Sequence, residues 1–293
     1  MKFNHLLLTL ALVSVSVFPL ESFAKNAPKE AENDSTTQIG LSVSIGADLV
    51  SSYLWRGQNL GGISIQPSLT VDWKGLYLSG WANIGADNWT FEDLNPELDI
   101  TIGYDNYGVQ ADLTHLYYFG GDPYFPKGGF GKELHYDSVS TSMEAHVGFH
   151  LGDLVEKVPL SIDWYTTIYG ADCYQDSVGN WKRAWSTYIE VGYAFELPLG
   201  IMLNTSIGFT PWIGLYSGYE EVWKNAKTVA INNIHIHAER DFEFKGISFG
   251  AWAECMLNCY GIDKYNFTTQ LSDKWNQRFN WSIGGCIYLT SEW

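Results

Sequence analysis

The chain has 293 residues, a formal net charge of −16 at pH 7, and charged side chains at only 17% of its positions. Ordinary globular proteins have about 25% charged residues, and the 16% of aromatic residues, the 13 Trp and the 29 Gly are also high. The acidic balance excludes the basic footprint of a nucleic-acid-binding protein. Few charges, many aromatic residues and many small residues are typical of membrane β-barrels, although a secreted β-sandwich or jelly roll can share this composition.

The first 24 residues have the order of a secretory signal peptide. Lys2 gives a positive start, residues 6–17 are almost all apolar, and Ser22-Phe23-Ala24 supplies small residues for a cleavage site. We therefore expect residues 1–24 to be a signal peptide. Residues 25–37 are polar and aperiodic, so we expect a disordered periplasmic arm there. No later stretch has the roughly 18 consecutive apolar residues of a membrane helix.

Residues 38–293 alternate apolar and polar side chains over stretches close to the length of about 9–11 residues that a barrel strand needs to cross a membrane. Ile45 and Leu49, for example, alternate with Gly46 and Asp48. Twelve stretches show this pattern: residues 39–50, 63–73, 76–84, 98–105, 109–114, 139–151, 160–169, 185–193, 201–209, 234–239, 247–254 and 279–293. The even number predicts an all-β fold, a transmembrane antiparallel up-and-down β-barrel with both termini in the periplasm.

The connections between these stretches alternate in length. The short ones are residues 74–75, 106–108, 152–158, 196–200 and 241–246, and the long ones are residues 51–62, 86–96, 119–137, 170–182, 211–227 and 258–275. Short periplasmic turns and long extracellular loops are typical of outer-membrane barrels. A soluble sandwich has no reason to alternate in this way, so the pattern favours the barrel.

The last stretch, residues 279–293, is amphipathic up to its end. Phe279, Trp281 and Ile283 share one face, and the chain stops on Trp293. Such a strand resembles the signal that outer-membrane barrels present to their insertion machinery, so we expect that machinery and outer-membrane lipid as partners. An apolar edge strand at the end of a soluble sheet would instead be an aggregation hazard.

A further resemblance covers residues 46–118. It rests on the run Ser51-Ser52-Tyr53-Leu54-Trp55-Arg56-Gly57-Gln58, followed by Gly80-Trp81-Ala82-Asn83, Glu97-Leu98-Asp99 and Gly103-Tyr104. In this order they resemble the opening part of the TorF family of porin-like outer-membrane proteins. The resemblance implies a barrel and a porin-like function, and it supplies no catalytic residues.

The polar face of the strands predicts an acidic lumen. The carboxylates that we expect to line the pore are Asp48, Asp72, Asp99, Asp105, Asp112, Glu144, Asp163, Glu190, Glu239 and Glu254. Almost no strand Lys or Arg shares their parity, and acidic rings favour cations. We therefore expect a porin-like channel for small polar solutes, with cations favoured and no cofactor. A second interpretation stays open, in which these carboxylates are only solvated or hydrogen-bonded to inward Tyr, Ser and His.

Barrel size predicts a narrow or loop-gated lumen. Eight strands give an interior filled by side chains, and about 16–18 strands leave an open aqueous pore. The inward aromatic residues that we expect to narrow the lumen further are Trp81, Tyr165, Tyr169, Tyr188 and Trp252. The alternatives are a non-conducting barrel, structural or accessory in an envelope complex, and a barrel enzyme.

Four inward His are candidate metal ligands, although we expect no bound metal because no established metal-site spacing is present. The candidates are His146, His150, His235 and His237. The last two are two residues apart and share a strand face, and imidazole suits zinc, copper, iron or nickel. A site would require a carboxylate such as Glu144 or Glu239 to approach. For the enzyme alternative, His115 has outward parity near a loop, but no Ser can be assigned beside it.

The four Cys are expected to be free thiols. Cys255 has outward and Cys286 inward parity, so they should not pair, whereas a bridge between the loop residues Cys173 and Cys259 is the second choice, since export permits disulfides.

One register irregularity is expected at Asn232-Asn233. Val229 and Ile231 have the opposite parity to Ile234 and Ile236, and a slip of one residue inverts the facing of every side chain beyond it.

Overall fold

The computed structural model describes residues 40–85, 97–118, 141–155, 157–170, 172–175, 178, 181–212, 214, 216, 229–244, 247–259 and 279–292. The expected signal peptide (residues 1–24), the expected arm (residues 25–37) and Trp293 lie outside the described residues. No helix in the described part of the chain is long and apolar enough to cross a membrane.

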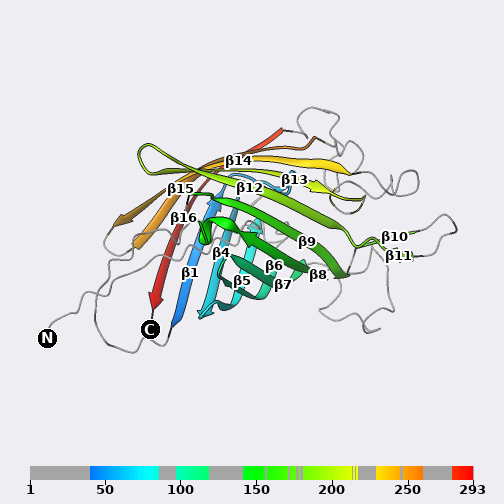
Figure 1. The fold of residues 1–293 in the computed structure, drawn as a ribbon, viewed down its shortest axis with the longest axis horizontal. Helices are drawn as coiled ribbons and strands as arrows, with labels where there is room; N and C mark the ends of the chain where they lie inside the picture. Colours follow the sequence, from blue (N-terminus) through cyan, green and yellow to red (C-terminus); the bar gives the residue numbers. More distant parts are fainter. Residues whose placement is uncertain are drawn as a thin grey trace.

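Twelve long strands form one closed antiparallel barrel, which confirms the predicted fold class (Figure 1). The strands are β1 (Leu41–Val50), β4 (Ser64–Trp73), β5 (Leu76–Gly85), β6 (Glu97–Asn106), β7 (Val109–Tyr118), β8 (Thr141–His150), β9 (Leu160–Gly170), β12 (Thr187–Leu197), β13 (Ile201–Thr210), β14 (Ala230–Phe244), β15 (Ile247–Leu257) and β16 (Phe279–Glu292). Each pairs with its neighbours in the chain, and β1 closes the barrel against β16, from Ser42 opposite Glu292 to Val50 opposite Gly284. Closure leaves no open sheet edge.

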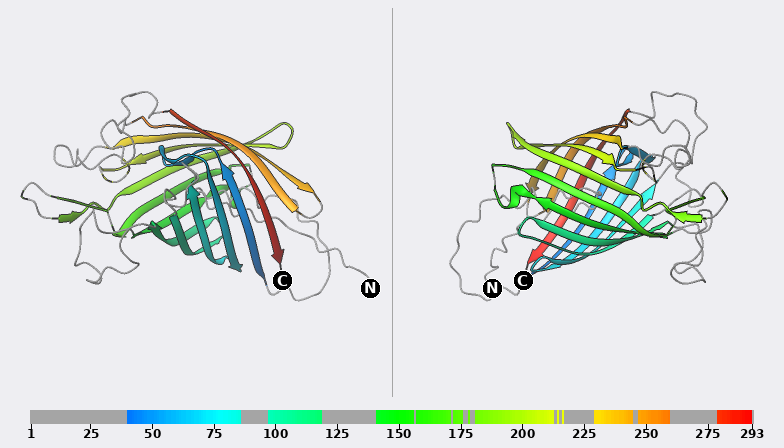
Figure 2. Two further views of the ribbon diagram at one scale, coloured as in Figure 1. Left: turned by 180° about the vertical axis from the view of Figure 1, so that it is seen from behind. Right: turned by 45° about the vertical axis from the view of Figure 1, so that its right-hand side comes forward.

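The two ends of the barrel differ, as the connection lengths predict. Four short connections and a longer one containing the 3₁₀ turn η1 (Leu151–Asp153) gather at the end where β1 begins, called here the short-turn end. Lys74-Gly75 and Tyr107-Gly108 have positive φ at both positions, the geometry of the two-residue turns that match strand twist. At the opposite, long-loop end lie the small hairpins β2 (Tyr53–Trp55) with β3 (Gln58–Gly61) and β10 (Cys173–Gln175) with β11 (Trp181–Arg183). The second of these projects beyond the barrel (Figure 2).

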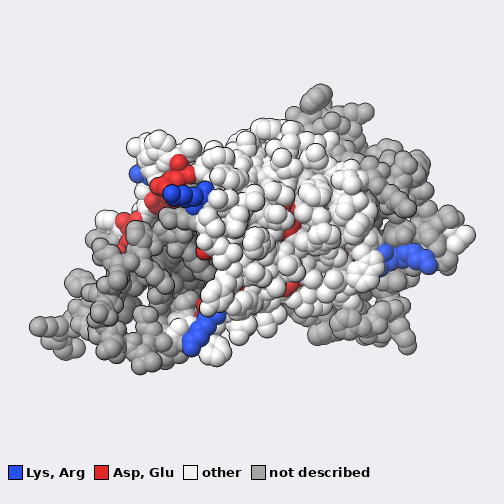
Figure 3. Space-filling model, in the orientation of Figure 1, with Lys and Arg blue, Asp and Glu red and all other residues white. Residues whose placement is uncertain are grey.

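The outside of the barrel is apolar because alternate side chains on each strand point outward. On β6, Ile102 is 62% exposed, whereas its neighbour Thr101 is buried. On β16, Trp281 is 60% exposed and Ser282 is buried. Between its two ends, the face in Figure 3 shows no Lys or Arg and few acidic atoms. An exterior of this kind is stable in lipid rather than in water.

Two β-bulges break the alternation. On β14, Gly208 pairs with Asn233 and Phe209 with Ile231, so the extra residue Asn232 turns inward and both Asn side chains are buried. The register irregularity expected there is therefore confirmed.

On β9 the second bulge overturns an expectation. Glu144 pairs with Thr167 but Met143 pairs with Tyr169. Ile168 is therefore the extra residue, and Tyr169 shares the outward face of Met143. The prediction that Tyr169 narrows the lumen was wrong because strict alternation does not survive an inserted residue.

Candidate functional site

The β2–β3 hairpin folds back into the barrel and forms a plug. Trp55 is buried and Arg56 is only 1% exposed, although both belong to a connection between barrel strands. The turn has positive φ at Arg56 (46°) and Gly57 (80°). A Cβ atom on Gly57 would lie 2.1 Å from the backbone oxygen of Asn232, and Asn258 Nδ2 donates to the Gly57 carbonyl oxygen (3.3 Å). The tip of the plug is thus docked on β14 and the end of β15.

Arg56 forms a buried ion pair with Glu144 of β8. Arg56 Nη1 lies 2.6 Å from Glu144 Oε2 and Nη2 lies 2.8 Å from Oε1, a two-pronged arrangement. The Tyr216 hydroxyl donates to the same Glu144 Oε2 (2.6 Å) and also accepts from Arg56 Nη1. Burial raises the pKa of the Tyr216 phenol, which lies in a loop, so its hydroxyl keeps the proton that it donates. Breaking a buried pair of this kind costs about 3–5 kcal/mol.

Aromatic rings enclose the guanidinium on its other sides. Its central carbon lies 3.9 Å from the ring centre of Tyr165, 4.7 Å from that of Trp55, 4.8 Å from that of Tyr188 and 5.0 Å from that of Tyr216. Cation–π contacts contribute about 2 kcal/mol or more when desolvated. Together with Tyr53 and Trp81 these rings form one buried cluster. The expected inward positions of Trp81, Tyr165 and Tyr188 are therefore confirmed.

A ladder of His and Asp side chains continues from the plug toward the short-turn end. His146 stacks on Tyr165, with ring centres 4.2 Å apart. Its Nδ1 lies 2.7 Å from Asp112 Oδ2 and its Nε2 lies 3.1 Å from Asp163 Oδ1. His150 Nε2 lies 3.0 Å from the same oxygen of Asp163. The ladder crosses β7, β8 and β9, and Asp163 Oδ1 joins its two imidazoles. The other ring nitrogen of His150, Nδ1, is buried with no hydrogen-bond partner among the described residues.

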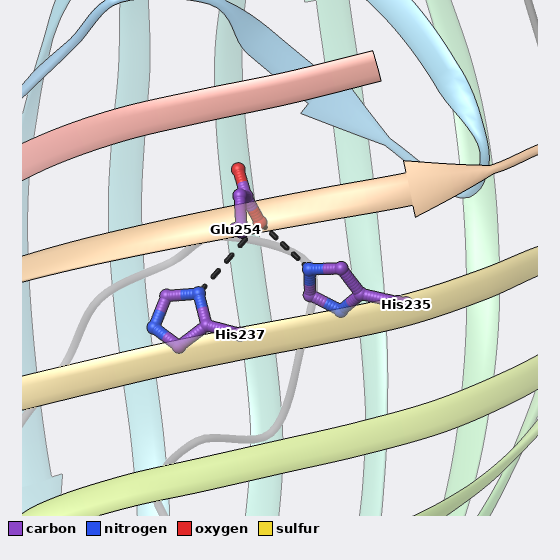
Figure 4. Close-up of side chains that lie close together, drawn as sticks. All are labelled: His235, His237 and Glu254. Atoms are coloured by element: carbon purple, nitrogen blue, oxygen red, sulfur yellow. Dashed lines mark hydrogen bonds and ion pairs between the residues drawn. The ribbon is translucent and has the colours of Figure 1, made fainter. Parts of the chain in front are cut away.

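A second histidine group lies on the facing strands β14 and β15. His235 Nε2 is 2.8 Å from Glu254 Oε2, and His237 Nδ1 is 3.7 Å from the same oxygen (Figure 4). His237 Nε2 faces Glu239 Oε2 at 3.5 Å. A third group that brings possible ligand atoms within 4.8 Å of one another is formed by Asp105, His150 and Asp153.

The structure places seven of the ten expected lumen carboxylates in these groups. Glu144 and Glu190 lie at the plug, where Glu190 accepts from the Tyr188 hydroxyl. Asp105, Asp112 and Asp163 belong to the ladder or its end, and Glu239 and Glu254 to the second histidine group. The other three lie apart: Asp48 is half-buried on β1, Asp99 is buried on β6, and Asp72 accepts from the Gly75 backbone N–H at the short-turn end (3.4 Å).

The other sequence-based candidates have separate surroundings. His115 Nε2 lies 2.5 Å from Thr141 Oγ1, which also donates to the Leu116 carbonyl oxygen (3.1 Å). Cys255, Cys259 and Cys286 are free thiols, and the side chain of Cys173 lies outside the described residues.

Sequence reasoning missed the positive charge in the lumen. The expectation that almost no Lys or Arg of the strands faces inward considered the strands alone, and the buried Arg56 comes from a loop. The signal was present in the sequence, because a Trp-Arg-Gly triplet in a polar connection joins a cation, an aromatic ring and a flexible turn residue. Its partner Glu144 lies 88 positions away, which no local pattern reveals.

Comparisons with known proteins give likenesses of shape only. No family model matches the chain, and no curated protein matches its sequence; the TorF-family resemblance therefore stays a prediction. Among solved structures, the COG4313 outer membrane channel from Pseudomonas putida F1 is 11% identical with a TM-score of 0.43, covering 90% of this chain and 99% of that chain. The CymD monoaromatic hydrocarbon channel is 10% identical with a TM-score of 0.37, covering 88% and 89%. Salmonella typhi OmpF in complex with daunomycin is 10% identical with a TM-score of 0.33, covering 86% and 97%. Likenesses this distant carry no information on function, which has to come from the residues of the barrel itself.

Proposed function

We propose that the chain is an exported outer-membrane barrel that works as a narrow, plug-gated channel for small polar solutes, with cations favoured. The observation that supports it best is the hairpin that buries Arg56 among inward carboxylates and aromatic rings. The apolar exterior fits outer-membrane lipid, and the strand count fits a short-turn end in the periplasm. Recognition of β16 by insertion machinery is part of the same proposal.

Selection would come from the acidic wall. Carboxylate rings attract cations, and low-dielectric walls strengthen that attraction because the field is focused in the lumen. Glu144 is neutralised by Arg56 and Asp99 is only 2% exposed, so the half-buried inward carboxylates, such as Asp48 and Glu254, would carry the preference. Solutes would move passively, and the plug would decide when the path is open.

Gating would come from undocking of the β2–β3 hairpin. The hairpin is tied to the wall by the Arg56–Glu144 pair and by the contacts of Gly57 with Asn232 and Asn258. β2 and β3 form a sheet of their own rather than joining the barrel sheet, and the chain leading into β2 is bonded to β16 through Ser51 and Ser52. Undocking therefore leaves the barrel ladder intact.

The test is ion selectivity in planar bilayers under a salt gradient. Wild-type protein should give a reversal potential that indicates cation selectivity, and Asp48→Asn combined with Glu254→Gln should move that potential toward zero. Asp99→Asn is the matched control, because the Asp99 side chain is only 2% exposed and its loss should change the potential little. A reversal potential that indicates anion selectivity, or one that the double variant leaves unchanged, contradicts the role given to these carboxylates.

A second candidate is a non-conducting barrel that serves as a structural or accessory partner in an envelope complex. The filled aromatic cluster around Arg56 favours it, because such a cluster blocks passage while it stays docked. Absence of channel events from both the wild type and a variant with the plug released would support this candidate over the channel.

A further inference from the structure

The second histidine group has the composition of a transition-metal site. His235 and His237 lie two residues apart on β14 and therefore point to the same face, and Glu254 lies opposite His237 on the neighbouring strand β15. Figure 4 shows the carboxylate between the two rings. The three side chains are held by a barrel ladder rather than by a loop, so their separation is fixed by strand register.

The distances fit one ion with small adjustments. Each residue offers a ligand atom within 4.8 Å of the other two. The present separations are 2.8 Å from His235 Nε2 and 3.7 Å from His237 Nδ1 to Glu254 Oε2. Ligands at zinc distances of about 2.0–2.2 Å in a tetrahedral site lie about 3.3–3.6 Å apart. Movements of less than an ångström in the side chains would provide that spacing.

Outer groups are already in place to orient one ligand. Ligating histidines commonly direct their second nitrogen at a carboxylate, and His237 Nε2 faces Glu239 Oε2 at 3.5 Å. Asn204 Nδ2 donates to the other oxygen of Glu239 (3.3 Å), which holds that carboxylate. This arrangement turns His237 Nδ1 toward Glu254.

We propose that His235, His237 and Glu254 form a lumenal binding site for a divalent transition-metal ion of the zinc class, with Glu239 as the positioning residue. Two imidazoles favour zinc, copper, nickel or iron over calcium and magnesium, which prefer oxygen ligands. Three protein ligands leave a coordination position for water or an exchangeable group. The binding site stands on its own geometry. Its effect on ion flow rests on the proposed channel function, and it narrows the cation class that the lumen selects.

The primary experiment is Zn²⁺ titration of the purified full-length barrel by calorimetry. Wild-type protein should bind one equivalent that His237→Asn and Glu254→Gln each remove, and Glu239→Gln should weaken its binding by about 10–100-fold. His115→Asn is the matched control, since His115 belongs to a separate group with Thr141, and it should leave this equivalent unchanged. Circular dichroism and heat-modified gel mobility show that each variant is folded. Equal Zn²⁺ binding by the wild type, His237→Asn and Glu254→Gln would overturn the site.

Conductance separates this inference from the channel proposal. Zn²⁺ should reduce potassium current through the wild type and leave that of His237→Asn unchanged. If the barrel conducts but the variants bind as much Zn²⁺ as the wild type, the metal site is overturned and the channel proposal is not. If the barrel carries no current, yet the wild type binds one equivalent of Zn²⁺ that the variants do not bind, the metal site is supported and the channel proposal fails.

Discussion

Replacing Arg56 by Met should release the plug. The substitution keeps an apolar side chain, but it removes the cation that contacts four aromatic rings and leaves Glu144 buried without its partner. Removing one member of a buried pair costs about 3–5 kcal/mol. Since about 1.4 kcal/mol corresponds to a tenfold change in an equilibrium, the ratio of undocked to docked hairpin should rise by roughly two to four orders of magnitude.

The assay is single-channel recording of wild type and Arg56→Met in planar bilayers. The variant should show a higher open probability and a larger conductance, because the hairpin leaves the lumen while the twelve-strand ladder stays closed. Arg240→Gln is the control, since it removes a cation that is exposed at the short-turn end, and its currents should match the wild type.

A double variant tests the physical reason. Adding Glu144→Gln to Arg56→Met removes the orphaned charge, so it should recover part of the docked population, and the two effects should be strongly non-additive. Identical open probability and conductance in the wild type and in folded Arg56→Met would refute the gating role of the pair.

Three further results are expected. Gly57→Ala should also raise open probability, because its Cβ would lie 2.1 Å from the Asn232 backbone oxygen and its φ of 80° disfavours a side chain. An open probability equal to that of the wild type would contradict the docking of Gly57 against Asn232. Ile102→Arg, on the lipid face, should lower the free energy of unfolding from lipid vesicles by up to about 2–4 kcal/mol, measured by urea titration, and an unchanged midpoint would count against lipid exposure there. Tyr169→Phe should leave conductance unchanged because β9 turns Tyr169 outward, whereas an altered conductance would place that ring in the path.

The strands could be predicted from the sequence because alternate residues of a barrel strand face the lipid and the lumen and therefore differ in polarity. Ile102 and Thr101 on β6 show this clearly, and two-residue turns such as Lys74-Gly75 mark the strand ends. The pattern fails where one residue is inserted. At Asn232 the parity change was visible in the sequence, but at Ile168 the neighbouring side chains gave no sign of the bulge.

The contacts inside the lumen were less predictable because they depend on register and on loops. Alternation placed His235 and His237 on one face, but it did not select Glu254 as their partner. That pairing depends on the length of the β14–β15 turn, which is two residues rather than the expected six because the strands extend to Phe244 and from Ile247. The entry of Arg56 into the lumen is a tertiary event that alternation does not encode.

The most direct test of the central claim is solute uptake by proteoliposomes, measured by osmotic swelling. Vesicles with wild-type barrel should swell slowly and only in small polar solutes, and vesicles with Arg56→Met should swell faster and admit larger ones. No swelling in either, with both proteins folded and inserted, would contradict the claim that this barrel is a channel closed by its own arginine hairpin.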